Sequence, residues 1–457
     1  MTADEPLTGQ LANLVDDLIV RAATMASPVV APDSPAAPGL IDALGRVTGR
    51  ASDRGERAVI GWTITPVTEA LQALHGLLKD PGWQASRHAP RIRAALRQQL
   101  TDPHPVNRML AAQALQLIEP AGPSRLALAR QRLLAEPDAH IRAVLVFQLM
   151  SLVAEHAAAV DGLVAELDSS GSWPFASTSP AHGATTADEQ SAVENDDDTL
   201  ANQELVQATV LLVLRLAIQH QQAAAIRIVH RWFTDPVDHA DLVHAAVDQL
   251  RKLGVLVPDR EDSTAAGTAF ALLSEATGQL ATMIEAQRSG QERDDAVLRT
   301  ALELADTVVD QLYYASGAFG ERRTATSGPQ EQAGSSSPTG TAFFDLAMPL
   351  LDQLAQIHHP RITHRLVETL AHLAEYDPKR VLLTVHRAVP PGEDYTYEPL
   401  AVGLIVRLVQ RYLAENRELV TTDEDVLTAL RELIEVFVRA GWPEAITLAY
   451  QLPNAFR

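Results

Sequence analysis

The feature of this 457-residue sequence that most constrains its fold is a helical spacing of apolar residues along most of the chain. In segments of about 10 to 20 residues, apolar side chains recur at i, i+3, i+4 and i+7, which places them on one face of an α-helix. No segment shows a convincing alternation of apolar and polar residues, which is typical of a half-buried strand. We therefore predict an all-α protein.

Length and composition favour an elongated helical array over one core. A chain of this length usually divides into domains or grows by repetition. Aromatic residues make up only 5% of the chain, and the abundance of alanine, leucine and valine favours closely packed helices. Cysteine is absent. This excludes disulfides, thiolate catalysis and cysteine-ligated metal centres, and it favours a reducing compartment.

Two segments share a pattern at an offset of 35 residues. Residues 100–118, LTDPHPVNRMLAAQALQLI, combine an acid and prolines in a turn with an alanine-rich apolar helix. Residues 134–152, LAEPDAHIRAVLVFQLMSL, align with them so that Ile141 falls on Val106. The proline directs the chain into the next helix, and the apolar stripe packs on the preceding pair.

This pattern resembles HEAT and armadillo repeats, with Asp102 and Pro103 at the turn positions and Val106 and Arg108 opening the helix. The resemblance implies an α-solenoid of antiparallel helical pairs. Weaker copies begin near Thr234, His359 and Asp377. The alternatives are a generic helical bundle and a TPR-like array, although the tryptophan and glycine signature of TPR repeats is not visible.

The final hundred residues resemble, more loosely, the helical C-terminal end of very large bacterial ATP-binding proteins, some of which are similar to anti-phage defence factors. The segments that carry this resemblance are LAEYDPKRVLLTVHRAV, YEPLAVGLIVRLVQRYLAEN and FVRAGWPEAITLAYQL. The resemblance implies a regulatory part of a larger assembly, with its ATPase outside this chain. No Gly-Lys pair occurs in the sequence, so this chain holds no P-loop.

Three stretches interrupt the helical pattern: residues 27–58, 168–199 and 317–341. They are rich in proline, glycine, serine or acidic residues, and we expect that none buries enough apolar surface to offset its chain entropy. We interpret them as flexible linkers or long loops, the second acidic and disordered. The predicted modules are an N-terminal repeat module at 1–167, a central helical module at 200–316 and a C-terminal repeat module at 342–457.

Helix ends are marked most clearly near the C-terminus. Thr421 with Glu424 three residues later predicts a capping box, Gly441 ends the helix, and Pro443 suits the first turn of the next one. Such short connections make neighbouring helices antiparallel.

The sequence also carries expectations about location. Residues 1–20 contain acids and no basic stretch leading into an apolar core, so we expect no secretory signal and a cytoplasmic location. The most apolar run, Ala208–Ile218, includes Arg215 and is shorter than the roughly 20 residues of a spanning helix. We predict that it is a buried solenoid helix and that the protein has no membrane partner.

Charge is distributed unevenly along a chain of net charge −21. Residues 81–150 hold nine arginines against four acids, whereas residues 151–200 hold ten acids and no lysine or arginine. The arginine fork suits phosphate or carboxylate recognition. The predicted partner-binding residues are Arg87, Arg91, Arg93, Arg97, Arg108, Arg130, Arg132 and Arg142, with Arg125 between them. The competing interpretation is that these arginines pair with acids of neighbouring helices.

Two further hypotheses concern the acidic stretch. Its carboxylates would fold back on the arginines and compete with an anionic ligand; they are Asp188, Glu189, Glu194, Asp196, Asp197 and Asp198. The aromatic residues of Trp173-Pro174-Phe175 would either anchor a partner or dock on the chain's own helices.

Histidines concentrate between residues 358 and 372. The cluster comprises His358, His359, His364 and His372, with Glu368 and Glu375. The i, i+4, i+8 spacing would present a metal-ligand face, but a solvated helix face is the favoured interpretation. We predict no metal site, no cofactor and no catalytic residues, and no H-E-x-x-H or G-x-S-x-G motif occurs.

These observations predict a non-enzymatic scaffold, or a regulatory or sensor solenoid, whose most expected partner is another protein. The alternative is a nucleic-acid-binding repeat protein that uses the arginines of residues 87–142. A third interpretation is an enzyme whose carboxylates are brought together only by folding.

Overall fold

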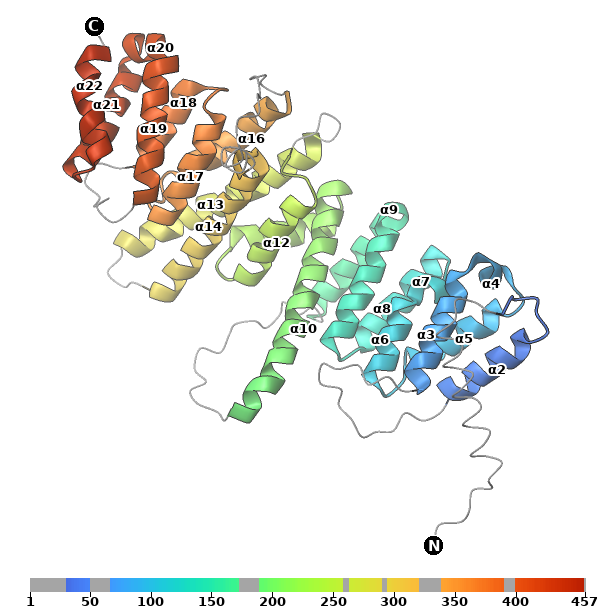
Figure 1. The fold of residues 1–457 in the computed structure, drawn as a ribbon. Helices are drawn as coiled ribbons and strands as arrows, with labels where there is room; N and C mark the ends of the chain where they lie inside the picture. Colours follow the sequence, from blue (N-terminus) through green and yellow to red (C-terminus); the bar gives the residue numbers. More distant parts are fainter. Residues whose placement is uncertain are drawn as a thin grey trace. The chain divides into compact units, whose positions relative to one another are not determined.

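The computed structural model describes residues 30–49, 66–171, 189–257, 263–289, 294–319, 338–389 and 399–455. Every regular element in these ranges is a helix, so the predicted all-α class is confirmed (Figure 1). The chain divides into two compact units. Unit 1 holds Met1–Leu216 with His220–Ala225, and unit 2 holds Ala217–Gln219 with Ile226–Arg457.

Unit 1 stacks its helices in two layers. They are α2 (Ala37–Thr48), α3 (Pro66–Lys79), α4 (Pro81–Ala85), α5 (Ala89–Gln99), α6 (Pro105–Gln113), α7 (Leu115–Ile118), α8 (Gly122–Ala135), α9 (Ala139–Ser169) and α10 (Glu189–Leu214). One layer runs through α3, α6, α9 and α10, and the other through α5, α7, α8 and α9. Helix α9 contributes to both layers because its backbone is non-helical at His156, with φ −133° and ψ 31°.

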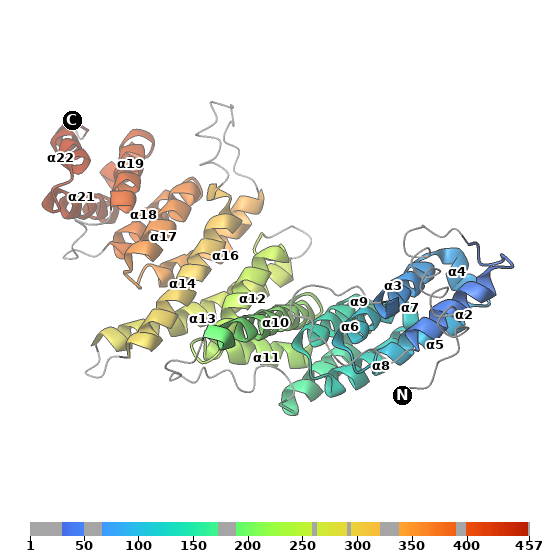
Figure 2. The ribbon, with the colours of Figure 1, turned by 60° about the horizontal axis from the view of Figure 1, so that its bottom comes forward.

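Unit 2 repeats this arrangement. Its helices are α11 (Ala223–Thr234, whose first three residues belong to unit 1), α12 (Ala240–Lys252), α13 (Ser263–Ser289), α14 (Asp295–Ser316), α16 (Pro338–Leu354), α17 (Pro360–Leu373), α18 (Pro378–Ala388), α19 (Pro399–Glu415), α20 (Arg417–Thr422), α21 (Glu424–Arg439) and α22 (Pro443–Ala455). Helices α12, α14, α17, α19 and α22 contact in series, as do α13, α16, α18 and α21 (Figure 2).

Alternation between two layers is the α-solenoid architecture that the repeats predicted. Each helix packs against the next helix and against the following helix of its own layer. Helix α17 shows the result, since Ile362, Leu366, Leu370 and Leu373 are each at most 1% exposed. Burying such a side chain contributes about 1.5 to 3 kcal/mol before chain entropy is counted.

Proline and aspartate fix where helices begin. Proline is the first residue of α6, α17, α18 and α22, where its missing N–H costs nothing and its fixed φ suits the helix. Asp138 caps α9 by accepting from the Ile141 N–H at 3.2 Å. Gly441 has φ 81° and ends the helix before Pro443, as predicted. These local signals explain the short inter-helix turns.

The predicted capping box at Thr421 was wrong. Thr421 lies within α20, where its Oγ1 donates to the carbonyl of Arg417 at 3.0 Å. Asp423 caps α21 instead, accepting from the N–H groups of Asp425 at 3.1 Å and Val426 at 3.2 Å. A carboxylate one residue before the helix satisfies these amides directly, so the threonine is not needed.

All three predicted breaks contain helical residues, and in the third α16 begins at Pro338 rather than after residue 341. Helix α2 lies inside residues 27–58 and buries Ile41, Leu44 and Val47 against α3 and α5. Helix α10 begins at Glu189, inside the predicted linker 168–199, so the acidic run 194–198 is helical. Packing of three apolar side chains outweighs the proline and glycine content around α2. The rest of the second break, residues 172–188, lies outside the described residues, as does 320–337 of the third.

One buried carboxylate joins distant parts of unit 1. Asp161 on α9 is 9% exposed and accepts from the backbone N–H groups of Ala224 at 3.0 Å and Ala225 at 2.8 Å. These amides open α11, so a side chain about sixty residues earlier acts as the cap of that helix.

Two helical stretches, Ala139–Ser169 and Thr199–Gln219, are long and apolar enough to cross a membrane. The predicted buried helix at Ala208–Ile218 is confirmed within the second, with Val210, Leu214 and Ile218 at most 2% exposed. Helices α9 and α10 pack against each other, so helix packing uses much of their apolar surface. The absence of a membrane partner stays a prediction.

Candidate functional site

Three arginines of residues 87–142 surround a buried carboxylate at the repeat junction. The Glu136 side chain is fully buried, and Arg108 donates to it through Nε at 3.1 Å and Nη2 at 2.9 Å. Arg132 donates through Nη2 at 3.0 Å. Arg142 is half-buried, and its burial lowers its pKa while Glu136 acts in the opposite direction. A single acid therefore gathers positive charge from three helices, α6, α8 and α9.

The other predicted arginines are also engaged within unit 1. Ion pairs join Arg91 to Asp42, Arg97 to Glu119, and Arg130 to Glu166. Two more donate hydrogen bonds: Arg93 Nε to the Leu117 carbonyl at 3.1 Å and Arg87 Nε to His88 at 3.4 Å. Side chains of Arg91, Arg97 and Arg130 stay half-exposed. The pairing favours the interpretation that these arginines serve internal contacts, and their role in partner binding stays a prediction.

The hypotheses about the acidic stretch are not tested. Trp173, Pro174, Phe175 and Asp188 lie outside the described residues. The run from Glu189 to Asp198 is known only as the backbone of α10.

The histidine face of α17 is not the solvated face that we expected. Side chains of His364 and Glu368 are 15% and 10% exposed, because this face packs against α14. Across the interface, Arg365 Nε lies 3.0 Å from Asp310 and Arg361 Nε lies 2.9 Å from Asp306. The polar residues thus join two helices. Within the described ranges, no group of three or more histidines and acids is placed to hold a metal ion.

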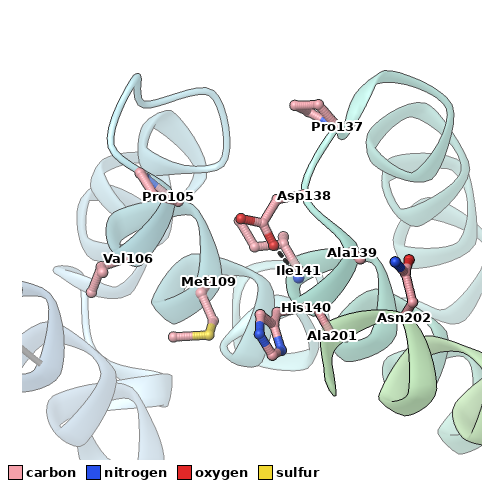
Figure 3. A pocket seen from close by; sticks show the side chains of 10 residues that line it. All are labelled: Pro105, Val106, Met109, Pro137, Asp138, Ala139, His140, Ile141, Ala201 and Asn202. Atoms are coloured by element: carbon pink, nitrogen blue, oxygen red, sulfur yellow. Dashed lines mark hydrogen bonds between the residues drawn. The ribbon is translucent and has the colours of Figure 1, made fainter. Parts of the chain in front are cut away.

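A pocket of about 390 Å³ opens on unit 1 where α6, α9 and α10 meet. It is lined by Pro105, Val106, Met109, Pro137, Asp138, Ala139, His140, Ile141, Ala201 and Asn202. Figure 3 shows Met109, His140 and Asn202 presented by three different helices, while Asp138 is occupied in capping α9. The lining combines apolar side chains with the polar groups of Asp138, His140 and Asn202, and such a mixture can both pack against a ligand and orient it.

Uncharged side chains lie beside His140 on α9. On α9, Val144 and Phe147 follow His140 at helical spacing, so they share its face. Phe147 is 51% exposed. Gln148 Nε2 donates to the Gln113 carbonyl at 3.4 Å and links α9 to α6. We call Val106, Met109, Gln113, His140, Val144, Phe147, Gln148, Asn202 and Glu204 the charge-poor face. Glu204 is its one acid, with Oε2 3.0 Å from His140 Nδ1.

This face suits recognition of another polypeptide more than chemistry. Interface centres are depleted in charge and enriched in aromatic residues and methionine, and Phe147 and Met109 fit that description. Neither residue belongs to a charged cluster, so the charge pattern of the sequence does not indicate them. The available signal was the run His140, Val144, Phe147, Ser151, which places an aromatic ring on the polar side of an amphipathic helix.

No protein-family model matches this chain. No curated protein matches it either. Among solved structures, it is similar to an engineered protein from a structural genomics consortium, at 13% identity and a TM-score of 0.29, covering 93% of this chain and 94% of the other. A circular tandem repeat protein with novel repeat topology also matches, at 13% identity and a TM-score of 0.29, covering 98% and 96%. A third match, from a homology model of the full-length AP-3 complex, has 10% identity and a TM-score of 0.25, covering 96% and 85%.

Proposed function

We propose that this protein is a non-enzymatic, cytoplasmic interaction scaffold that binds another protein through the charge-poor face of unit 1. The observation that carries the proposal is the exposed Phe147 ring on the same helical face as His140, which lines a 390 Å³ pocket. The pocket offers space for an apolar side chain of the partner, and Phe147 offers an anchor. A few such residues supply most of the affinity in a typical interface.

Amide side chains support the same proposal. Gln113, Gln148 and Asn202 on this face each offer both donors and acceptors, so they can hydrogen-bond the backbone of a partner without introducing charge. An interface built this way would depend little on salt. The membership of a bacterial, defence-type assembly that the C-terminal segments imply stays a prediction.

Nucleic-acid binding through the arginines remains the alternative function, and salt separates the two. Binding to DNA phosphates releases counterions and weakens steeply as salt rises. We expect no retention of the chain on DNA or heparin at low salt, because Arg91, Arg97 and Arg130 already have carboxylate partners. Retention that is lost on changing Arg91, Arg93 and Arg97 to glutamate would favour the alternative.

The test of the proposal is a capture experiment that starts from nuclease-treated host extract and ends with the purified partner. The wild-type chain, Phe147→Glu and Met109→Glu are compared by calorimetric titration. Losing a central anchor should weaken binding at least tenfold.

Tyr450→Glu is the matched control, because Tyr450 is 80% exposed but lies in unit 2. It should bind like the wild type. An exposed substitution such as Phe147→Glu is expected to change stability by only about 0.5 kcal/mol, so a loss of binding cannot be attributed to unfolding. If partners bind Phe147→Glu and Met109→Glu as tightly as the wild type, the charge-poor face is not the interface.

A further inference from the structure

Three aromatic rings gather at the C-terminal end of α14 in unit 2. The ring centroids of Tyr313 and Tyr314 are 5.4 Å apart, and those of Tyr314 and Phe319 are 5.3 Å apart, both pairs edge to face. Tyr313 is buried, whereas Tyr314 and Phe319 are each 40% exposed. The cluster therefore presents two rings to solvent and rests on a third.

A hydrogen-bonded turn holds Phe319 against the helix end. Gly317 adopts φ 89°, a left-handed conformation that reverses the chain. The Ser316 hydroxyl donates to the Tyr313 carbonyl at 2.8 Å and accepts from the Ala318 N–H at 3.3 Å. The exposed rings thus sit on a defined turn, which reduces the entropy that a partner loses on binding them.

Arg251 on α12 lies beside these rings, and its closest contacts are with uncharged groups. Its Nε donates to the Gln311 Oε1 at 2.6 Å, and its Cζ lies 5.4 Å from the centroid of the Tyr314 ring. A carboxylate oxygen of Asp248 is 3.9 Å from Nη2, and Asp248 lies closer to Lys252, at 2.6 Å from Nζ. The guanidinium is oriented while its charge is only weakly compensated, and the side chain is 42% exposed.

A neighbouring arginine, Arg365, has its charge compensated by carboxylates. The Arg365 Cζ lies 4.8 Å from the centroid of the Tyr313 ring, so it makes the same kind of ring contact. Its Nε, however, is 3.0 Å from Asp310 and its Nη1 is 2.9 Å from Glu368. Two carboxylates neutralise Arg365, whereas Gln311 and Tyr314 leave the charge of Arg251 in place.

We propose that Arg251, Tyr314 and Phe319 form a binding site for an acidic peptide segment. A carboxylate of the peptide pairs with the Arg251 guanidinium, whose planar fork matches two carboxylate oxygens. An adjacent apolar side chain packs on the exposed rings of Tyr314 and Phe319. The charge of Arg251 and the apolar rings beside it select this ligand. The site lies wholly in unit 2, so the test of this proposal does not depend on whether the charge-poor face of unit 1 binds a partner.

The test uses the full chain and two fluorescein-labelled peptides, followed by anisotropy. One peptide carries glutamates on both sides of a single leucine, and the other has glutamines in place of the glutamates. We expect the glutamate peptide to bind at least tenfold more tightly, since hydrogen bonds between charged groups contribute more than neutral ones.

Variants locate the site. Arg251→Gln should weaken binding of the glutamate peptide about tenfold or more, and Arg251→Lys should restore only part of it because lysine lacks the fork. Tyr314→Ala should weaken binding about fivefold or more, through loss of ring contact and of the platform under Arg251. Arg299→Gln is the matched control for Arg251→Gln. Arg299 is exposed on α14, the helix that carries Tyr314, and lies fifteen residues before Tyr314.

Thermal unfolding of each variant, followed by circular dichroism, shows whether it is folded. The proposal is overturned if the glutamate peptide does not bind up to millimolar concentration, if both peptides bind equally, or if Arg299→Gln weakens binding as much as Arg251→Gln.

Discussion

Two sites, one in each unit, use arginine in opposite ways. In unit 1, Arg108 and Arg132 converge on the buried carboxylate of Glu136, and the charge-poor face carries one acid. In unit 2, Arg251 is held by an amide and an aromatic ring. A carboxylate partner cancels the charge of an arginine, whereas an amide or a ring orients it and leaves the charge available. The nature of the partner therefore decides whether an arginine makes a surface basic.

The same rule explains the arginine-rich segment. Counting charge within residues 81–150 gives a basic excess, but two of the compensating acids lie outside that window. Arg91 pairs with Asp42, and Arg130 pairs with Glu166. Folding brings these acids to the arginines from earlier and later helices. A local excess of charge in the sequence is therefore no measure of the charge of the folded surface.

The largest expected effect tests whether unit 1 depends on its buried carboxylate. Glu136→Ala leaves Arg108 and Arg132 without their shared partner in a buried site, and removing one member of such a group costs about 3 to 5 kcal/mol. We expect a loss of that size in the free energy of unfolding, measured with urea.

Glu166→Ala is the control for this experiment. It breaks the ion pair with Arg130, but both side chains are substantially exposed, and exposed pairs contribute little. Equal losses of unfolding free energy in the two variants would show that the buried carboxylate of Glu136 stabilises unit 1 no more than an exposed one does.

A smaller effect is expected at Asp161. Asp161→Ala removes the acceptor for the N–H groups of Ala224 and Ala225, and losing a helix cap costs about 1 to 2 kcal/mol. The urea unfolding midpoint should fall accordingly. Asp161→Asn keeps an acceptor oxygen and should recover part of the loss. No change in Asp161→Ala would show that water replaces the cap and that this carboxylate has no structural role.

The smallest expected effect is a pH dependence of stability that arises from Asp306 in unit 2. Burial raises the pKa of Asp306 above its ordinary value of 3.8, and Arg361 acts in the opposite direction. The folded state therefore binds this proton more tightly than the unfolded state. The free energy of unfolding should fall as pH rises from 3.8 through the raised folded value.

Asp306→Asn should remove this contribution, because asparagine does not titrate. Urea unfolding of both proteins between about pH 4 and pH 8 checks it. As pH rises, the free energy of unfolding of Asp306→Asn should increase relative to that of the wild type. Parallel profiles would contradict the prediction and show that Arg361 fully compensates Asp306.

Particular residues show how far prediction from the sequence reached. The start of α22 at Pro443 was predicted from the sequence, because a proline at the first helical position acts locally. Helix α2 was missed because its apolar residues form a helix only when α3 and α5 cover them. Phe147 was missed for a related reason, as exposure of a ring depends on which helices leave it uncovered.

The sequence by itself determined the all-α class, the 35-residue offset between two repeats and a few helix starts such as Pro443, since helix periodicity and proline geometry depend on residues a few positions apart. Tertiary structure decided which charges survive at the surface. Glu136 meets Arg108 from 28 positions earlier, and Arg251 meets Gln311 from 60 positions later. Electrostatic compensation depends on distance in space, and only the packing of helices sets that distance.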